Sequence, residues 1–335
     1  MASARVHGRH EREDALTEAA PENRPRKWLW LVVRLGVALL ALGWTLSRVP
    51  LEEVTGGLLE ISGGTVLLVF CAFAGVFVAQ VTRWWCVLTA YGASGIPHPF
   101  SLLRLYLEGF FYNTFLPGNV GGDLLRAHVT RKLFPGWGGG YVIVFVERVF
   151  GLVGLLLVSN IVLLFWSVPG IGNLAPLGMA GLVAAFAASI LPILARQASN
   201  FVPGKPGKFL ANLPLPTRPV FLFGAIAASI TAWLFVAAAG HALIVTNGDV
   251  SLQASMVIVP VAMTAVYFPA TVAGLGVREA AFVLLYERVG VDSVAATAGS
   301  LGMLGMQLGI AAVGGVMHVL WPLRIARIRE MNALD

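Results

Sequence analysis

The sequence predicts an all-α polytopic membrane protein with about six full spans and two re-entrant helical hairpins. Three observations predict this fold. Of the 335 residues, 57% are hydrophobic and only 12% are charged, whereas soluble domains carry about 25% charged residues. Apolar runs of about 20 residues, the length at which a helix crosses a bilayer, recur along the chain. Two other segments are amphipathic and interrupted by proline and glycine.

The ends of the chain are polar. Residues 1–27 are mixed in charge and contain two prolines, so we expect a disordered cytoplasmic tail. The apolar run that follows ends without a small-residue cleavage site, which argues against a secretory signal. We expect one transmembrane domain over residues 28–323 and a basic cytoplasmic tail over residues 324–335.

Long apolar runs are the candidate membrane helices. They fall at about 28–46, 62–82, 139–166, 173–194, 219–246, 251–269 and 295–322. The segment at 277–290 would be only ~21 Å long as a helix, which is too short to cross a bilayer. We therefore expect it to pair with the run at 251–269 in one hairpin, while the other six runs cross the membrane.

The distribution of lysine and arginine gives the orientation. These residues gather before the first run, in the 195–218 loop and after the last run, whereas the loops at 167–172 and 247–250 carry none. By the positive-inside rule, both termini and the 195–218 loop are expected in the cytoplasm, and the 48–61 loop outside. This assignment requires segment 100–132 to dip in from the cytoplasm and return. The second hairpin must then dip in from the outside.

The tips of the two hairpins carry similar sequences. The first reads FLPGNVGGDLLR from Phe115 to Arg126, and the second reads FPATVAGLGVRE from Phe268 to Glu279. Proline and glycine break helices, and such breaks occur at membrane depth only where protein or water satisfies the freed backbone groups. Paired breaks in two halves that enter from opposite faces are typical of an inverted-repeat transporter. Ordinary interfacial loops, in which proline and glycine are also common, are the alternative.

Charged residues beside the breaks point to a binding site. Ionisable groups in a membrane are costly unless paired or hydrated, and a helix N-terminus after each break offers N–H groups to an anion such as a phosphate. The candidate substrate-binding residues are Glu108, Asn113, Pro117, Gly121, Gly122, Asp123, Arg126, Glu147, Arg148, Pro269, Gly274, Gly276, Arg278 and Glu279.

Glu147 and Arg148 lie inside one apolar run. As neighbours on a helix they point about 100° apart, so each is expected to find its own partner, for example Arg126 or Arg278 for Glu147. An ordinary buried ion pair that holds helices together is the alternative.

Other polar residues in the runs have simpler interpretations. We expect Arg83 to be an interfacial anchor and Gln307, which lies among glycines, to take part in close helix packing. His241 and His318 stand alone and are expected to be structural. The sequence contains no metal-ligand spacing and no nucleotide-binding or hydrolase motif, so neither a metal nor a cofactor is expected. It also lacks the basic, aromatic-rich module of a nucleic-acid-binding protein.

Four motifs occur in order along the chain. They are Arg83-Trp84, Asn113 to Gly118 with Gly121 to Asp123 and Arg126, Glu147-Arg148 with Gly151, and Gly274 to Glu279. Together they resemble the lysylphosphatidylglycerol synthase transmembrane region, also called the flippase-like domain. The resemblance covers about residues 28–323.

The resemblance implies a multi-pass protein of a prokaryotic cytoplasmic membrane. In the multiple peptide resistance factor, a domain of this kind moves an aminoacylated phospholipid between leaflets, and a soluble aminoacyl transferase domain follows it. That second domain is missing here, so we do not expect synthesis of the modified lipid. Relatives stand alone or beside glycosyltransferases and act on polyprenyl-phosphate sugars, hopanoids or other lipids, so the resemblance does not fix the substrate.

Three functions follow as hypotheses. The first is a lipid flippase for a phospholipid or a polyprenyl-phosphate-linked lipid. The second is a non-transporting membrane subunit or scaffold for a glycosyltransferase or another lipid-modifying partner enzyme. The third is a membrane enzyme with Asp123 or Glu279 as base, which no nucleophile–base pair supports. We therefore expect a non-enzyme, and the oligomeric state cannot be read from the sequence.

Overall fold

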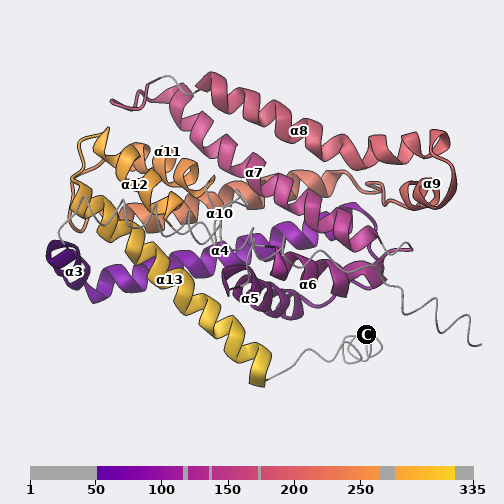
Figure 1. Ribbon diagram of the computed structural model, residues 1–335, viewed down its shortest axis with the longest axis horizontal. Coiled ribbons are helices and arrows are strands. Elements are labelled where there is room, and N and C mark those ends of the chain that lie inside the picture. The colour runs from indigo at the N-terminus through magenta and orange to yellow at the C-terminus, as the bar shows by residue number, and fades with distance from the viewer. Residues whose placement is uncertain (1–50, 116–119, 136–137, 173–174, 265–275, 321–335) are drawn as a thin grey trace, which may run out of the picture.

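The computed structural model describes residues 51–115, 120–135, 138–172, 175–264 and 276–320, and over these it is built from helices alone. The helices are α3 (Leu51–Leu59), α4 (Gly63–Ala90), α5 (Pro99–Phe115), α6 (Gly121–Thr130), η1 (Arg131–Leu133), α7 (Gly139–Phe165), α8 (Ala175–Gln197), η2 (Ala198–Phe201), α9 (Gly204–Ala211), α10 (Val220–Ile244), α11 (Leu252–Met263), α12 (Val277–Glu287) and α13 (Ser293–Leu320). Figure 1 shows them packed in one bundle. The predicted all-α fold is confirmed.

Five helices are long and apolar enough to cross a membrane. They span Gly63–Ala90, Gly139–Phe165, Gly178–Phe201, Val220–Ile244 and Ser293–Leu320. They match five of the six predicted spans. The sixth, at 28–46, and the two predicted tails lie outside the described residues.

Helices α4 and α10 run antiparallel at the centre of the bundle. At one end, the Thr217 amide donates to the Ala90 carbonyl at 2.8 Å. At the other end, Asn247 Nδ2 donates to the Gly57 carbonyl at 3.0 Å. We call the end that holds Ala90 and Thr217 the basic end, because the arginine- and lysine-rich 195–218 segment lies there, and the end that holds Gly57 and Asn247 the opposite end.

The two predicted hairpins are present as helix pairs. Helices α5 and α6 form the first, whose base is closed at the basic end by a hydrogen bond of 3.0 Å from the Ser94 amide to the Leu133 carbonyl. Helices α11 and α12 form the second. There the Tyr286 hydroxyl, near the end of α12, donates to Ser255 Oγ, near the start of α11, at 3.1 Å. In Figure 1 the two pairs occupy different halves of the bundle, so they enter from opposite ends.

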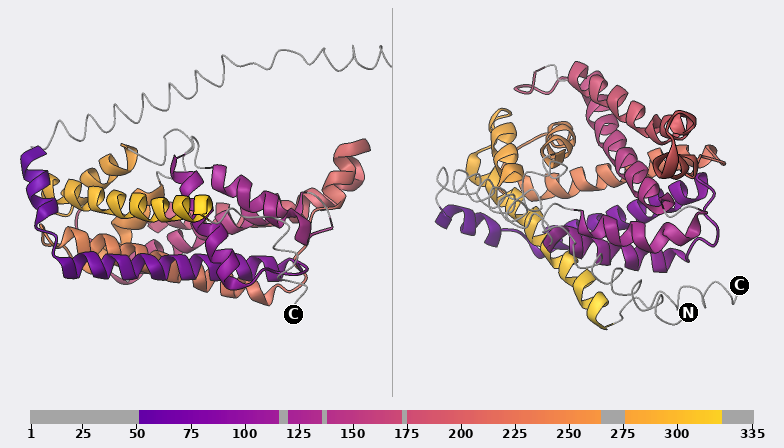
Figure 2. Two further views of the ribbon diagram at one scale, coloured as in Figure 1. Left: turned by 90° about the horizontal axis from the view of Figure 1, so that it is seen from below. Right: turned by 45° about the vertical axis from the view of Figure 1, so that its right-hand side comes forward.

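Two predicted loops contain helices. The 48–61 loop contains α3, in which Glu52 and Glu53 occupy the first turn, where negative charge favours the helix dipole. The 195–218 loop contains η2 and α9, with Lys208 in the last turn of α9. Helix α8 forms an outer layer that packs against α7 (Figure 2, right).

Candidate functional site

A cavity of about 380 Å³ lies between the ends of α5 and α11, helix α6 and the long helices. Seven helices line it: α4, α5, α6, α7, α10, α11 and α13. One part of the lining is apolar and includes Phe73, Phe110 and Met303. The other part is strongly polar. The cavity therefore offers both an apolar surface and a polar surface, as an amphipathic ligand requires.

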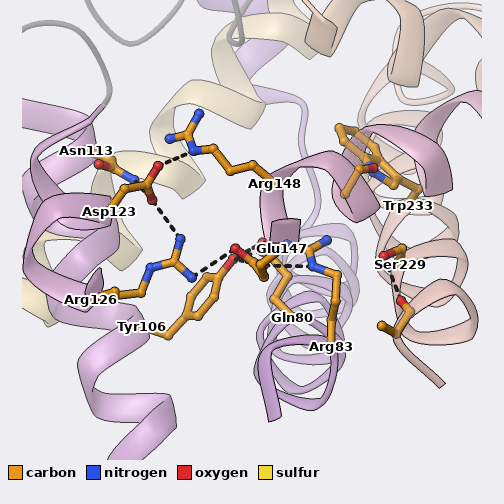
Figure 3. Close-up of polar contacts among 12 residues, drawn as sticks. Gln80, Arg83, Tyr106, Asn113, Asp123, Arg126, Glu147, Arg148, Ser229 and Trp233 are labelled. Carbon is orange, nitrogen blue, oxygen red and sulfur yellow. Dashed lines mark hydrogen bonds and ion pairs between the residues drawn. The ribbon is translucent and has the colours of Figure 1, made fainter. Parts of the chain in front are cut away.

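Five charged side chains in the polar part of the lining are linked by ion pairs, and we call them the ion-pair chain. Arg83 Nε donates to Glu147 Oε1 at 2.7 Å, and Arg126 Nη1 donates to Glu147 Oε2 at 3.1 Å. Arg126 Nη2 donates to Asp123 Oδ1 at 2.7 Å, and Arg148 Nε pairs with Asp123 Oδ2. Positive and negative groups thus alternate from α4 through α7 and α6 and back to α7 (Figure 3).

Arg126 is the most enclosed cation of this chain. Its guanidinium lies over the Tyr106 ring at 4.4 Å and over the Trp84 ring at 5.2 Å, within the range of favourable cation–π contact. The Tyr106 hydroxyl donates to Gln80 Oε1 at 2.6 Å. These contacts fix the Arg126 guanidinium between Glu147 and Asp123.

Arg148 differs from the other members of the chain. Its side chain is 31% exposed, whereas that of Glu147 is 1% exposed and that of Arg126 is 5% exposed. Arg148 therefore places a cation at the edge of the cavity, next to Asp123.

The start of α6 is held tightly against α5. The Gly122 amide donates to Asn113 Oδ1 at 2.7 Å. A Cβ atom on Gly122 would lie 1.8 Å from the Gly109 carbonyl oxygen, so the two helices can approach this closely only with glycine at position 122. This approach brings Asp123 and Arg126, one turn apart on α6, into the cavity.

The predicted site residues of α5, α6 and α7 divide into two groups. Asn113, Asp123, Arg126, Glu147 and Arg148 line the cavity. Gly121 and Gly122 begin α6 behind it. The predicted pairing of Glu147 with Arg126 is present, and Glu147 and Arg148 do turn to different partners. Pro117, Pro269 and Gly274 lie outside the described residues.

The predicted site residues at the start of α12 lie outside the lining of the cavity. Arg278 Nε donates to Glu279 Oε1 at 3.0 Å, and both residues are 0% exposed. Gly276, at φ +81°, donates its amide to Glu279 Oε2 at 2.6 Å, so α12 uses its own carboxylate as the cap. Arg278 reaches the cavity indirectly, because its Nη1 donates to Gln307, which does line it.

Glu108, a predicted substrate-binding residue, is not among the residues that line this cavity. Its carboxylate accepts from Arg104 Nε at 2.9 Å and pairs with His318 Nδ1 at 3.1 Å. Arg104 and Glu108 are four residues apart and so share a face of α5, which faces α13. The residues of α5 that line the cavity, including Tyr106, Gly109 and Asn113, follow another face.

The sequence interpretation missed three groups of the site. Arg83 is a buried member of the ion-pair chain rather than an interfacial anchor. Gln80 and Tyr106 support that chain. The spacing of Gln80 and Arg83, one helical turn apart in an apolar run, was the available signal.

Comparison with known families decides what kind of protein carries this site. A family model described as the lysylphosphatidylglycerol synthase TM region matches residues 31–315. The chain belongs to this family. A search of curated proteins gives no match. As a member of the lysylphosphatidylglycerol synthase transmembrane-region family with at least five apolar spans among its described residues, the chain is a multi-pass membrane protein related to membrane lipids.

Proposed function

We propose that this family member is a lipid flippase, which moves a phosphate-bearing lipid between the two leaflets and catalyses no chemical reaction. The observation that carries the proposal is the cavity itself. It joins a chain of ion pairs to an apolar wall, and it lies inside a membrane domain, lined by residues of both hairpins. A charged group inside a membrane is costly, so its presence in a cavity favours a role in binding.

Arg148 is the side chain best placed to hold a lipid phosphate. It is the most exposed cation of the ion-pair chain and lies at the edge of the cavity. A planar guanidinium can donate two parallel hydrogen bonds to a phosphate. Arg83 and Arg126 are buried against Glu147, so we assign them the task of holding the carboxylates in place.

Asp123 gives the headgroup a second contact. Its Oδ2 atom pairs with Arg148, while Oδ1 is held by Arg126. When a phosphate engages Arg148, a cationic group on the same headgroup can take the vacated place at Oδ2. The site therefore suits an anionic or a zwitterionic headgroup, on a phospholipid or on a polyprenyl-phosphate-linked lipid.

The apolar wall receives the first carbons of the lipid tails. It includes Phe73, Val76, Phe110, Val236 and Leu304. A volume of about 380 Å³ is near the lower limit of ligand pockets, about 300–1,000 Å³. The cavity therefore holds a headgroup and its nearest carbons, and the remaining tail stays in the bilayer.

The hairpins supply the means of movement. They enter from opposite ends of the bundle, and the last residues of α5 and α11 both line the cavity. In inverted-repeat transporters, one repeat rocks against the other around a fixed central site, which opens to each side in turn. We infer the same movement of α5–α6 against α11–α12.

The test is lipid translocation by the purified chain in vesicles. Fluorescent phosphatidylglycerol and phosphatidylcholine are the probes, and a membrane-impermeant quencher reports the leaflet. We expect Arg148→Gln to slow translocation by about 10- to 100-fold, because a hydrogen bond to a charged group contributes about 1.5–3 kcal/mol. The matched control is Arg288→Gln, an exposed arginine after α12, which should translocate like the parent.

One outcome would reject the site assignment, and another would reject the flippase function. Equal translocation by Arg148→Gln and the parent would remove Arg148 from the site. No translocation of either probe, nor of lipids that copurify with the chain, would favour the alternative of a membrane subunit. In that case a lipid-modifying enzyme should copurify in a stable complex.

A further inference from the structure

Two glutamine side chains line the cavity, Gln80 from α4 and Gln307 from α13. In both, the amide oxygen is bonded within the protein. Gln80 Oε1 accepts from the Tyr106 hydroxyl at 2.6 Å and from Arg83 Nη2 at 3.4 Å, and Figure 3 shows Gln80 beside these two side chains. Gln307 Oε1 accepts from Arg278 Nη1. The NH2 end of each amide is therefore the end that remains.

The arginines decide which end of each amide they meet. A guanidinium donates hydrogen bonds and accepts none, so its partner atom on a glutamine must be the oxygen. Both guanidinium groups are themselves held by carboxylates. Arg83 Nε donates to Glu147 at 2.7 Å, and Arg278 Nε donates to Glu279 at 3.0 Å. Each glutamine thus has its oxygen fixed toward an ion pair and its NH2 group directed away from that pair.

The two NH2 groups are unused. Within the described part of the chain, neither Gln80 Nε2 nor Gln307 Nε2 donates a hydrogen bond. The other uncharged polar side chains of the described lining all donate within the protein, namely Tyr106, Asn113, Thr114 and Trp233. The glutamines therefore differ from the rest of the lining, because they offer neutral N–H donors to a ligand in the cavity.

Neutral donors select a particular part of a lipid headgroup. Arg148 is already assigned to the phosphate, which a guanidinium binds better than an amide does. A hydroxyl group suits an amide, because its oxygen accepts from NH2 while its hydrogen is donated to a carboxylate such as Asp123. A quaternary ammonium group contains no acceptor and would leave the amides unpaired. A site built to bind a hydroxyl group discriminates strongly against an analogue that lacks it.

We propose that Gln80 and Gln307 are specificity-determining residues that select a lipid with hydroxyl groups on its headgroup, beside the phosphate. This inference rests on the proposed flippase function and narrows its substrate class. The hydroxyl groups can belong to a glycerol or to a sugar, since both present the same acceptors. Arg83 and Arg278 are positioning residues for this task, because they orient the two amides.

The first experiment compares lipids of equal charge in the vesicle assay. Fluorescent phosphatidylglycerol and phosphatidylethanol each carry one negative charge, but only phosphatidylglycerol has headgroup hydroxyl groups. We expect the parent to translocate phosphatidylglycerol at least about fivefold faster, as two net hydrogen bonds would allow. A fluorescent glucosyl polyprenyl phosphate is the third probe. If it moves faster than phosphatidylglycerol, the hydroxyl groups belong to a sugar, and if it moves more slowly, they belong to a glycerol.

Variants of the glutamines separate recognition from a structural role. Gln307→Met and Gln80→Met should each lower the ratio of the phosphatidylglycerol rate to the phosphatidylethanol rate by about 2- to 10-fold. Gln307→Glu keeps an acceptor for Arg278 but loses the donor, so it should lower the ratio too. Its added charge repels both probes equally and cancels in the ratio. The matched control is Gln197→Met, an exposed glutamine at the end of α8, which should keep the ratio of the parent.

The second experiment measures binding without transport. The purified chain is mixed with equal amounts of phosphatidylglycerol and phosphatidylethanol, and native mass spectrometry counts the bound lipids. We expect phosphatidylglycerol to be bound in at least about threefold excess, and Gln307→Met to remove most of that excess.

These results separate the two proposals. Preferred binding of phosphatidylglycerol without translocation of any probe would reject the flippase function and keep hydroxyl recognition. Equal binding and equal translocation of the two phospholipids would overturn hydroxyl recognition and leave the flippase function standing. A parental ratio in both methionine variants would remove the glutamines from the site. A parental ratio in Gln307→Glu alone would reduce Gln307 to a partner of Arg278.

Discussion

Arg126 occupies the centre of the ion-pair chain. Its guanidinium donates to both Glu147 and Asp123, and it lies over two aromatic rings. Burying charges has a desolvation cost, which is offset only when each charge keeps its partners. Removing the central cation therefore affects two carboxylates at once.

We expect Arg126→Gln to lower the free energy of unfolding in detergent by about 3–5 kcal/mol, the usual effect of breaking a buried ion pair. Denaturant unfolding measures it. Tyr106→Phe is the control, because it keeps the ring beneath Arg126 but loses the 2.6 Å hydrogen bond to Gln80, which should cost about 1 kcal/mol. A loss for Arg126→Gln no larger than that of Tyr106→Phe would contradict a structural role for the chain.

At the scale of elements, the shape of the first hairpin depends on a single close approach. Gly122 at the start of α6 lies against the backbone of α5 at Gly109. The same approach aligns Asn113 with the Gly122 amide and directs Asp123 into the cavity. The close packing of α5 against α6 therefore sets the positions of Asn113 and Asp123 in the site.

Gly122→Ala should separate α5 from α6, because its Cβ atom would lie 1.8 Å from a carbonyl oxygen that cannot rotate away. We expect a stability loss of at least about 1–3 kcal/mol from overpacking, with slower lipid translocation. Gly305→Ala in α13 is the control. Its Cβ atom would meet nothing within 4 Å, so it should be neutral or stabilise the helix by up to about 1 kcal/mol. Equal stability of the two variants would disprove the tight contact.

Much of the helix arrangement could be predicted from the sequence, because spans need long apolar runs and hairpin tips need proline and glycine. The site could be predicted in part. Asp123, Arg126 and Glu147 stand out as charges in apolar surroundings. Glu108 is also a charge in apolar surroundings. However, the residues of α5 that face α13 and those that line the cavity are close neighbours in the sequence, so only the packing shows that Glu108 faces α13. Arg83 and Glu147 lie on different helices, and only the packing of α4 against α7 shows that they pair.

At the scale of the whole molecule, the two ends of the bundle differ in charge. The basic end carries the 195–218 segment with Arg196, Lys208 and Arg218, whereas the loops at 167–172 and 247–250 of the opposite end carry no lysine or arginine. The first hairpin opens at the basic end and the second at the opposite end. The side of the membrane on which the basic end lies therefore also fixes the side from which each hairpin enters.

Cysteine labelling in intact cells tests this orientation. In a background with Cys71→Ala and Cys86→Ala, single exposed positions carry the label: Lys208→Cys at the basic end and Asp249→Cys at the opposite end. Because positively charged loops stay in the cytoplasm, a membrane-impermeant thiol reagent should label Asp249→Cys in intact cells and Lys208→Cys only after permeabilisation. The reverse pattern would place the first hairpin on the outer side. Labelling of both positions in intact cells would contradict a fixed orientation, and with it the assignment of each hairpin to one leaflet.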